Sequence, residues 1–521
     1  MKRTEAPCPA CGAPVEFKAS SSLVTICTHC ESVVARGDQK LEDLGKVAAL
    51  VDTLTPLDLG VRGVYDGKSF ELVGRTQYRH ASGAVWDEWY IAFANGAWGW
   101  LAEAQGRFFL TVRRRPKDAS VLPAFESLTA GQNLQIGAPP PFTVNEAGVA
   151  QLIGAEGELP FRPDFAAAHR YADLSGPDGR FATLDYGESP PKLFLGQSVT
   201  LEQIGISPKV VDVEKQVKTI AALVVACPHC GGSLELRAPD RTERVVCPYC
   251  RAELDANQGE LRYMKTLSKS KIHPFLPIGG TGTLRGESYT VIGFLQRSVM
   301  IERVKYYWTE YLLFHERDGF RWLVDSNGHW NFVRPVSPGE VQTFGSSAKY
   351  DGRSFKLYQR CPARVEYVLG EFFWKVSAGE MAMVSDYIAP PFMLSAELSL
   401  SSHGGGAGQA QEINYSFGEY IPRGEISQAF NVPSLPMAWG VAPNQPHPVD
   451  RRVYALFVVF VLLLLGLDGL MSLIRPSGSV DHAWLGWLIA ALALVPGVAF
   501  MYGRGVEQKR WEDSYIEYPT G

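Results

Sequence analysis

Eight of the nine cysteines fall into two groups of four with nearly the same spacing. The first group reads CPACGAPVEFKASSSLVTICTHC from residue 8 to residue 30, and the second reads CPHCGGSLELRAPDRTERVVCPYC from residue 227 to residue 250. Each Cys-x-x-Cys turn can aim two thiolates at one point, and zinc prefers four ligands at the corners of a tetrahedron. We therefore predict two structural Zn²⁺ ions, with the ligand sets Cys8, Cys11, Cys27, Cys30 and Cys227, Cys230, Cys247, Cys250.

Paired disulfides are the alternative state for these thiols. The first residues, MKRTEAPCPACG, contain no apolar run typical of a signal peptide, so we expect a reducing compartment that favours metal binding. Four thiolates close the zinc shell, which argues against a hydrolytic site with an open position. His29 and His229 lie inside the turns and are predicted to be exposed non-ligands, while the ninth cysteine, Cys361, is predicted to be a buried apolar side chain.

The similarity between the two cysteine groups extends into the sequence that follows them. At a shift of 219 residues, GVYDGKSFELVG (63–74) lies over GTLRGESYTVIG (282–293). Three residues are then gained, and EWYIAFANGAWGWLAEAQGRFFL (88–110) lies over EYLLFHERDGFRWLVDSNGHWNF (310–332). Further on, Glu158 falls on Glu371 and Asp173 on Asp386. We infer that a zinc ribbon and the domain after it were duplicated as one cassette.

The domains after the ribbons are predicted to consist of β-strands. Short aromatic and β-branched runs are separated by Gly, Asn and Asp, and the pairs NG (95–96) and DG (318–319) predict hairpins at equivalent places. YDGRSFKLYQR (350–360) nearly repeats YDGKSFELVGR (65–75), which suggests that each domain contains two related halves. The apolar spacing in LEDLGKVAALVDTL (41–54) predicts a helix or helical connector.

A family resemblance rests on DLGVRGVYDGKSFELVGRTQY, WDEWYIAF and GAWGWLAEAQGRFFLT, preceded by a CPxCG ribbon. This combination resembles the bacterial family catalogued as domain of unknown function 4178. The resemblance covers both cassettes and is closer in the first, because GAWGWLAEAQG becomes GFRWLVDSNG in the second. It implies a ribbon followed by a β domain in an intracellular bacterial protein, and it supplies no catalytic residues.

The C-terminal part of the chain has a different composition. VYALFVVFVLLLLGLDGLMSLI (453–474) and AWLGWLIAALALVPGVAFMY (483–502) are each long enough to span about 30 Å of hydrocarbon as a helix. We therefore predict a transmembrane hairpin. Basic residues before the first run and after the second predict that both ends are cytoplasmic, in a multi-pass protein of the bacterial inner membrane. Asp468 lies inside the first run, and its role stays open between reaching the interface and a function.

The predicted fold class is mainly β, with two tandem cassettes of zinc ribbon plus antiparallel β domain, barrel-like or sandwich-like, followed by two transmembrane α-helices. The predicted boundaries are a ribbon at 1–40, a β domain at 41–215, a ribbon at 220–260, a β domain at 261–430, a Pro-rich linker at 431–450, the transmembrane hairpin at 451–503 and a cytoplasmic tail at 504–521.

The charge and the motifs restrict the function. A formal net charge of −5 and a pI near 6.1 argue against a protein that coats nucleic acid. No P-loop, dinucleotide fingerprint, G-x-S-x-G or H-E-x-x-H motif is present. Both cassettes share two acids, Glu88 with Glu103 and Glu310 with Asp325, which could face one cleft for acid–base chemistry or a cation, or could simply close strand ends.

These observations predict a membrane-anchored, non-catalytic zinc-binding scaffold that binds a partner protein at the cytoplasmic face of the membrane. A nucleic-acid-binding or regulatory zinc-ribbon protein is the alternative, because zinc ribbons often serve there. An enzyme that uses the paired acids is a third reading. The sequence identifies no catalytic or cofactor-binding residues and no small-molecule substrate.

Overall fold

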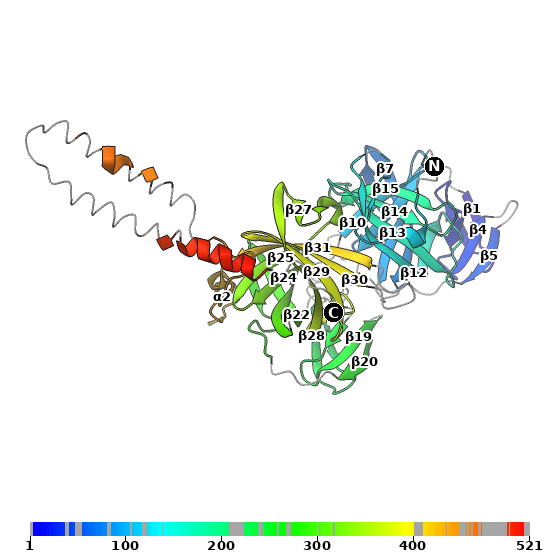
Figure 1. The fold of residues 1–521 in the computed structure, drawn as a ribbon. Coiled ribbons are helices and arrows are strands. Elements are labelled where there is room, and N and C mark those ends of the chain that lie inside the picture. The colour runs from blue at the N-terminus through cyan, green and yellow to red at the C-terminus, as the bar shows by residue number, and fades with distance from the viewer. Residues whose placement is uncertain are drawn as a thin grey trace, which may run out of the picture.

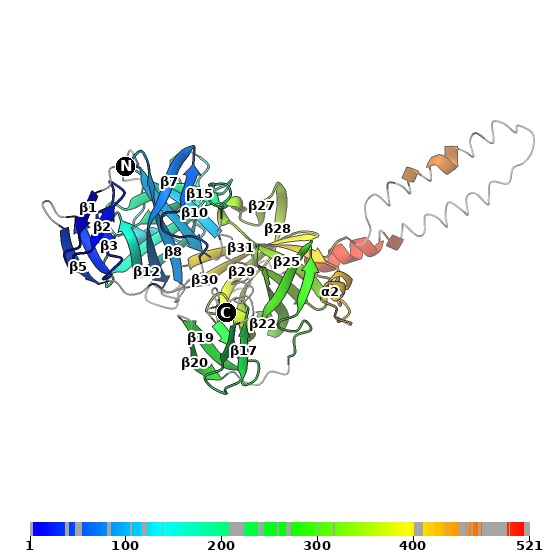
Figure 2. The same cartoon turned by 180° about the vertical axis from the view of Figure 1, so that it is seen from behind.

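The computed structural model contains two β-barrels, each joined to a small four-cysteine domain (Figures 1 and 2). The structure describes residues 4–36, 41–46, 50, 55–80, 85–104, 107–116, 122–137, 139–207, 223–237, 242, 244–257, 260–266, 272–301, 303–315, 318–400, 410–433, 435–447, 455, 458–459, 462–466, 470, 498–499 and 501–514.

The first barrel, barrel 1, closes through antiparallel pairing of eight strands in the order β7-β8-β9-β10-β15-β14-β13-β12 and back to β7. The strands are β7 (Lys68–His80), β8 (Val85–Phe93), β9 (Trp98–Ala104), β10 (Arg107–Arg114), β12 (Phe142–Leu159), β13 (Ala168–Ser175), β14 (Arg180–Asp185) and β15 (Lys192–Val199). Short β6 (Arg62–Tyr65), β11 (Asn133–Leu134) and the 3₁₀ turn η2 (Phe125–Ser127) accompany them.

The second barrel, barrel 2, repeats this order as β22-β23-β24-β25-β31-β30-β29-β28 and back to β22. Its strands are β22 (Glu287–Ile301), β23 (Val304–His315), β24 (Gly319–Ser326), β25 (His329–Val336), β28 (Arg353–Phe372), β29 (Met381–Ala389), β30 (Phe392–Leu400) and β31 (Ala410–Ile421). The accompanying elements are β21 (Thr281–Leu284), η3 (Pro338–Glu340), β26 (Gln342–Phe344), β27 (Ser347–Tyr350) and α2 (Arg423–Ala429).

The registers confirm the tandem repeat strand by strand. Thr76 pairs with Glu88 in barrel 1, and Leu295 pairs with Glu310 in barrel 2. The predicted hairpins are present, with positive φ at the second turn residue, Gly96 and Gly319, where glycine avoids a Cβ clash. The repeated YDG motif forms the same turn at the start of β7 and of β28, so it marks equivalent points in the two halves of a barrel.

Each four-cysteine domain extends the sheet of its own barrel. The first, ribbon 1, contains β1 (Thr4–Pro7), β2 (Pro14–Phe17), β3 (Val24–Ile26), β4 (Ser32–Arg36) and β5 (Leu41–Lys46), and β3 pairs with β12. The second, ribbon 2, contains β16 (Leu223–Ala226), β17 (Ser233–Leu236), β18 (Arg244–Val246), β19 (Ala252–Asn257) and β20 (Glu260–Thr266), and β18 pairs with β28.

The helix predicted for 41–54 is wrong over its first part. Leu41–Lys46 is strand β5, which pairs with β4, so pairing with the ribbon sheet overrides a helix-like apolar spacing. Of the remaining positions, 47–49 and 51–54 lie outside the described residues.

The inner face of each barrel can be recognised by contacts between strands that are not neighbours. Trp86 of β8 and Tyr171 of β13 approach with ring centroids 5.6 Å apart. In barrel 2, Arg297 of β22 donates to Glu397 of β30 at 2.9 and 2.8 Å. On the opposite face of β7 to β10, an apolar cluster is covered by Leu57, Ile204 and other residues from segments flanking the barrel. The inside of both barrels is therefore partly polar.

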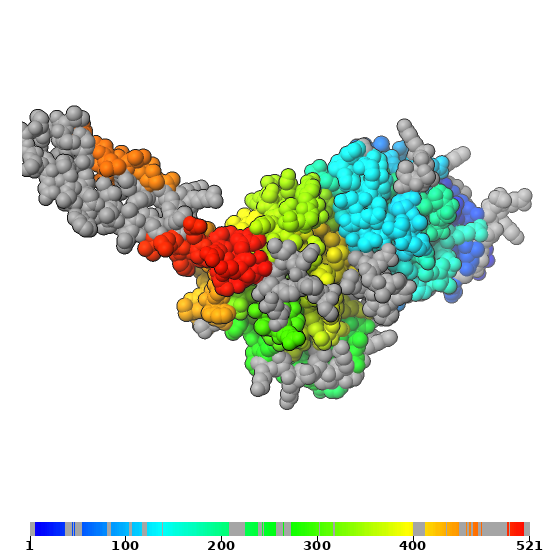
Figure 3. Space-filling model, viewed as in Figure 1, coloured from blue at the N-terminus to red at the C-terminus, as the bar shows by residue number. Residues whose placement is uncertain are grey.

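The two barrels contact each other directly (Figure 3). Glu146 of β12 pairs with Glu412 of β31, and the backbone N–H of Gly339 in η3 donates to Ser175 Oγ at 2.7 Å. A Cβ at Gly339 would lie 2.4 Å from the backbone of barrel 1, so only glycine permits this approach.

The C-terminal segment packs against barrel 2. The buried Asn444 donates to Pro391 O at 3.0 Å, and the helical residues 501–512, red in Figure 1, place Arg510 Nη2 at 2.6 Å from Gln445 O. Within the linker predicted at 431–450, residues 435–447 therefore rest on the barrel through specific contacts.

The predicted transmembrane hairpin requires correction. A spanning helix needs about 20 consecutive apolar helical residues. Within the described part of the chain, no helix combines the length and the apolar character required to cross a bilayer. The fold class is therefore wrong in its last part, and the inner-membrane location that rested on it is not supported. Most of 453–474 and 483–502, including Asp468, lies outside the described residues.

Candidate functional site

The eight cysteines that were predicted as ligands form two compact thiol groups. In ribbon 1, Cys8 Sγ lies 3.7 Å from Cys30 Sγ, and Cys11 Sγ lies 3.7 Å from Cys27 Sγ. In ribbon 2 the two corresponding distances, from Cys227 to Cys250 and from Cys230 to Cys247, are both 3.8 Å. Within each group all four sulfur atoms lie within 4.8 Å of one another.

These distances fit a metal centre and exclude disulfides. A disulfide needs about 2.05 Å between sulfurs. A tetrahedron with metal–sulfur bonds of about 2.3 Å has an edge of about 3.8 Å, which matches both groups. Each group could therefore hold one metal ion. Among the described residues both groups contain cysteines alone, and His29 and His229 are exposed beside them.

The backbone turns explain why the thiols converge. In the first turn of each ribbon, the N–H of Gly12 donates to Cys8 O at 2.8 Å, and that of Gly231 donates to Cys227 O at 2.8 Å. Both glycines have positive φ, 80° and 71°, which a residue without a Cβ adopts easily. The tight turn aims both sulfurs of the Cys-x-x-Cys pair to one side.

A buried carboxylate anchors each ribbon to its barrel. Glu158 at the end of β12 accepts hydrogen bonds from the backbone N–H of Ala19 at 3.0 Å, from that of Lys18 and from the Ser22 hydroxyl. Its repeat partner Glu371 accepts from the Arg237 N–H at 2.9 and 2.8 Å and from the Thr242 hydroxyl at 3.2 Å. The match between Glu158 and Glu371 in the sequence therefore reflects an anchoring role.

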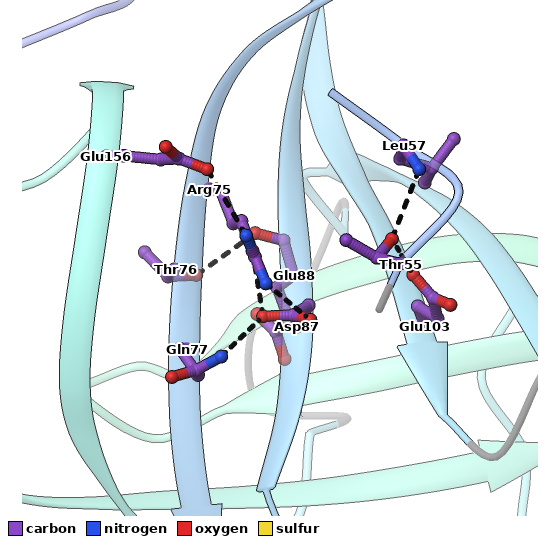
Figure 4. A network of polar contacts seen from close by, with 9 residues as sticks. All are labelled: Thr55, Leu57, Arg75, Thr76, Gln77, Asp87, Glu88, Glu103 and Glu156. Carbon is purple, nitrogen blue, oxygen red and sulfur yellow. Dashed lines mark hydrogen bonds and ion pairs between the residues drawn. The ribbon is translucent and has the colours of Figure 1, made fainter. Parts of the chain in front are cut away.

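The acid pairs that the sequence singled out are separated by the pleat of the sheet. Glu88 pairs with Ala102, whereas Glu103 pairs with Asp87, so Glu88 and Glu103 lie on opposite faces. Figure 4 shows Glu103 directed to the Thr55 hydroxyl, at 2.5 Å. In barrel 2, Glu310 and Asp325 are separated in the same way, and Asp325 accepts from the Gly328 N–H. Neither pair forms a two-carboxylate cleft.

Figure 4 also shows an ion pair on the face opposite Glu88. Arg75 donates to both oxygens of Asp87, at 2.9 and 3.0 Å, and lies 3.4 Å from Glu156. Phe294 and Thr309 occupy the equivalent positions of Arg75 and Asp87 in barrel 2, so this pair is particular to barrel 1.

Glu88 instead faces other carboxylates across the interior of barrel 1. We name the acid cluster as Glu88 of β8, Glu146 of β12, Asp173 of β13 and Asp185 of β14. All four are partly accessible to solvent. Trp86 Nε1 donates to Glu88 at 3.0 Å, Thr183 donates to Asp173 at 2.7 Å and Tyr171 donates to Glu146 at 3.0 Å.

Three carboxyl groups of the acid cluster have raised pKa values. Burial raises the pKa of Glu88 to about 7, and the charges of Asp173 and Asp185 add to the effect. Burial raises the pKa of Asp173 to about 6. Burial, followed by repulsion from Glu412 and Asp173, raises the pKa of Glu146 to about 8. The cluster therefore exchanges protons near neutral pH.

Barrel 2 has acids at three positions equivalent to the acid cluster, Glu310, Asp386 and Glu397, and it also has an arginine among them. Arg297 lies between Glu397, to which it donates at 2.9 and 2.8 Å, and Glu310, at 3.6 Å. Although burial would lower the pKa of Arg297, these two carboxylates raise it above its ordinary value. Gln359 donates to Asp386 at 2.6 Å. One internal guanidinium therefore pairs with Glu397 and lies near Glu310, and Asp386 is hydrogen-bonded to a neutral amide.

Cys361 is buried beside Val299, Ile301 and Trp308. Burial raises the pKa of its thiol to about 12, so the reactive thiolate is disfavoured at neutral pH. This agrees with the predicted apolar role.

Sequence reasoning missed Glu146, Asp185 and Arg297. No motif marks them, because the cluster combines residues from strands that are distant in the chain. A signal was nevertheless present: the repeat aligns Tyr78 with Arg297, so a buried charge changes between the two copies.

Comparison with sequence families matches residues 58–201 and 277–423 to the description "Domain of unknown function (DUF4178)". The two matches cover more than half of the chain and correspond to the two barrels. A search of curated proteins gives no match.

Proposed function

The chain belongs to the DUF4178 family, and from this premise we propose that it is a non-catalytic, zinc-stabilised scaffold that binds a partner protein, with barrel 1 carrying the binding and barrel 2 serving as a structural copy. The observation that carries this proposal is the contrast between the interiors. Barrel 2 places Arg297 between Glu397 and Glu310, whereas barrel 1 has no arginine at the equivalent position and leaves the acid cluster partly accessible.

The metal in both ribbons is proposed to be zinc in a structural role. Four cysteine sulfurs are the donor set that structural zinc prefers, and they leave no position for a reacting water. The anchoring by Glu158 and Glu371 supports this role, since each ribbon is held rigidly on a barrel.

A protein partner is favoured over nucleic acid by charge. The net charge is −5, and the distinctive site of barrel 1 is acidic. Phosphate backbones would be repelled by such a site and are bound by basic surfaces instead.

The proposal can be tested with matched double variants in the two barrels. Tagged full-length protein is cross-linked in cells and purified, and the bound proteins are compared among wild type, Glu88→Gln with Asp173→Asn, and Glu310→Gln with Asp386→Asn. Circular dichroism checks that each variant is folded. We expect a partner protein that is lost from the barrel 1 variant and retained by the barrel 2 variant.

Two results would contradict the proposal. One is the absence of any bound protein that depends on the barrel 1 residues. The other is the recovery of nucleic acid as the cross-linked species, with a steep decrease in binding as salt is raised.

A further inference from the structure

We propose that the acid cluster of barrel 1 binds a guanidinium group supplied from outside the chain, between carboxylates equivalent to those that hold the guanidinium of Arg297 in barrel 2. The ligand is an arginine side chain of a partner or a small guanidino compound, which share this chemistry. The inference rests on the proposed function, because it names what barrel 1 recognises.

The equivalence of the two interiors follows from strand registers. Trp86 faces Tyr78 in barrel 1, and Trp308 faces Arg297 in barrel 2, so Tyr78 occupies the arginine position. Asp173 faces Thr183 as Asp386 faces Ser395, which places Asp185 two residues on at the position of Glu397. The two carboxylates that hold Arg297, Glu310 and Glu397, are therefore matched by Glu88 and Asp185.

Barrel 2 shows how these positions bind a guanidinium. Glu397 accepts two hydrogen bonds from the Arg297 fork, Glu310 lies 3.6 Å away, and the Trp308 ring centroid lies 5.8 Å from the guanidinium carbon. Trp308 also donates to Glu310 at 2.7 Å. Barrel 1 retains this Trp–Glu hydrogen bond, so a positioned carboxylate is present there too. The Tyr78 ring stacks on Trp86 with centroids 5.6 Å apart, so the aromatic surface offered to a guanidinium is that of both rings.

The charge balance of barrel 1 favours a cation. Relative to barrel 2, barrel 1 has Tyr78 in place of Arg297 and Glu146 in place of Gln359, which removes a positive charge and adds a negative one. It also has Lys192 in place of Asn414, opposite Asp185, but the Lys192 ammonium lies 2.7 Å from Glu188. Two histidines face the cluster: His80 Nε2 lies 3.4 Å from Glu146, and His169 Nε2 lies 3.7 Å from Asp185. Burial lowers the pKa of both imidazoles, which disfavours their charged form. Among the described residues, Glu88 and Asp173 form no ion pair.

Guanidinium is favoured over ammonium by geometry. A planar fork can donate two parallel hydrogen bonds to one carboxylate, as Arg297 does to Glu397, and it stacks on an aromatic ring. An ammonium of the same charge lacks the fork. Binding should therefore distinguish agmatine, which carries a guanidinium, from putrescine, which has ammonium groups alone.

The test is calorimetric titration of the full-length protein at pH 8 with agmatine. We expect one site per chain, and binding at least tenfold weaker for putrescine. Asp185→Asn combined with Glu88→Gln should weaken agmatine binding at least tenfold, whereas Glu310→Gln should leave it unchanged. Tyr78→Arg, which supplies the arginine internally as barrel 2 does, should abolish binding and raise the unfolding temperature.

An absence of saturable agmatine binding to folded wild-type protein overturns the inference, as does binding that survives Tyr78→Arg in a folded variant. A short peptide with one central arginine distinguishes the source: tighter binding than agmatine indicates a partner's side chain, and weaker binding indicates a small compound. If agmatine fails while the cross-linked partner is still lost from the barrel 1 variant, this inference falls and the proposed function stands.

Discussion

At the scale of residues, the most informative positions are those where the two copies differ. Glu88 and Glu310 occupy the same place and accept from equivalent tryptophans, yet only Glu310 lies beside an arginine, at 3.6 Å. The exchange of Tyr78 for Arg297 therefore removes the guanidinium that lies beside this carboxylate.

The first prediction concerns the pH dependence of stability. Glu88 has a folded pKa of about 7, above its unfolded value of about 4.3, so folding takes up a proton between these values. Stability should therefore fall as pH rises from about 5 to 8, and Glu146 extends this range because its pKa is about 8. Glu88→Gln should raise the unfolding midpoint at pH 8 by about 2–4 °C, corresponding to about 1 kcal/mol.

This dependence is measured by thermal unfolding from pH 5 to 8.5, with the exposed Glu202→Gln as control. The control should keep the wild-type slope, and Glu88→Gln should reduce it. An unchanged slope in Glu88→Gln would show that Glu88 ionises normally in the folded protein.

The second prediction concerns the anchoring carboxylates. Glu158→Gln removes a charged acceptor for two backbone N–H groups and a hydroxyl, and should cost about 1–3 kcal/mol in attachment of ribbon 1. Hydrogen exchange at the amides of Lys18 and Ala19 should accelerate. Glu126→Gln, which changes an exposed ion pair with Arg170, should leave those amides protected. Equal protection in Glu158→Gln and wild type would contradict the anchoring role.

At the scale of elements, each ribbon is too small to be stable by apolar packing alone. The apolar cluster around the thiol group of ribbon 1 has four buried side chains, and two of them are the ligands Cys8 and Cys27. The other main cluster, formed by β3 and β4, packs against Ala155 and Leu159 of the barrel strand β12. Metal binding and attachment through β3 must supply the rest of its stability.

The third prediction follows from this dependence on metal. Purified protein should contain two zinc ions per chain, and Cys227→Ser should contain one, with ribbon 2 more sensitive to protease because the metal contributes to its folding. Elemental analysis gives the metal content, and proteolysis followed by mass spectrometry locates the cleavage.

Cys361→Ser is the matched control, because Cys361 lies inside barrel 2 and away from both thiol groups. It should retain two metal ions. A wild-type protein with no metal, purified without chelator, would contradict both zinc centres.

The sequence predicted the ribbons and the repeat because spacing alone carries those signals. It did not predict which acids meet. Glu88 and Glu103 stand on neighbouring strands, and their separation depends on the register, since a slip of one residue would move every side chain to the other face. The acid cluster also combines residues of β8, β12, β13 and β14, and contacts between strands so far apart in the chain leave no local sequence pattern.

The prediction of a transmembrane hairpin failed for another reason. Hydropathy measured the apolar character of 453–474 and 483–502, and it did not establish a continuous helix. The prolines predicted a stiff, extended linker at 431–450, and they carried no signal for the contacts by which residues 435–447, with the buried Asn444, lie on barrel 2.

At the scale of the whole molecule, the helical residues 501–512 pack on barrel 2, and we call this contact the clasp. Trp511 lies 6.1 Å from Tyr358, ring to ring, and the Lys356 ammonium lies 3.9 Å from the Trp511 ring centroid. A Cβ at Gly503 would lie 2.4 Å from the His447 ring. Residues 447 and 503, which precede and follow the two long apolar runs of the sequence, are therefore in close contact.

The fourth prediction is that Trp511→Ala opens this clasp. The loss of one aromatic and one cation–π contact should cost about 1–2 kcal/mol, and residues 501–512 should exchange their amide hydrogens faster. Lys509→Ala, which alters an exposed pair with Asp513, should change this exchange little. Faster exchange in Lys509→Ala than in Trp511→Ala would contradict the assigned contacts.

The β-bridge between Glu146 and Glu412 links the interior of barrel 1 to its contact with barrel 2. Glu146 lies in the interior of barrel 1 and also pairs with Glu412 of barrel 2. A proton or cation that neutralises Glu146 also removes its repulsion from Glu412. By thermodynamic reciprocity, a stronger contact between the barrels must favour the neutralised state of Glu146. Protonation or cation binding at Glu146 and the strength of the contact between the two barrels are therefore coupled, so each should change the other.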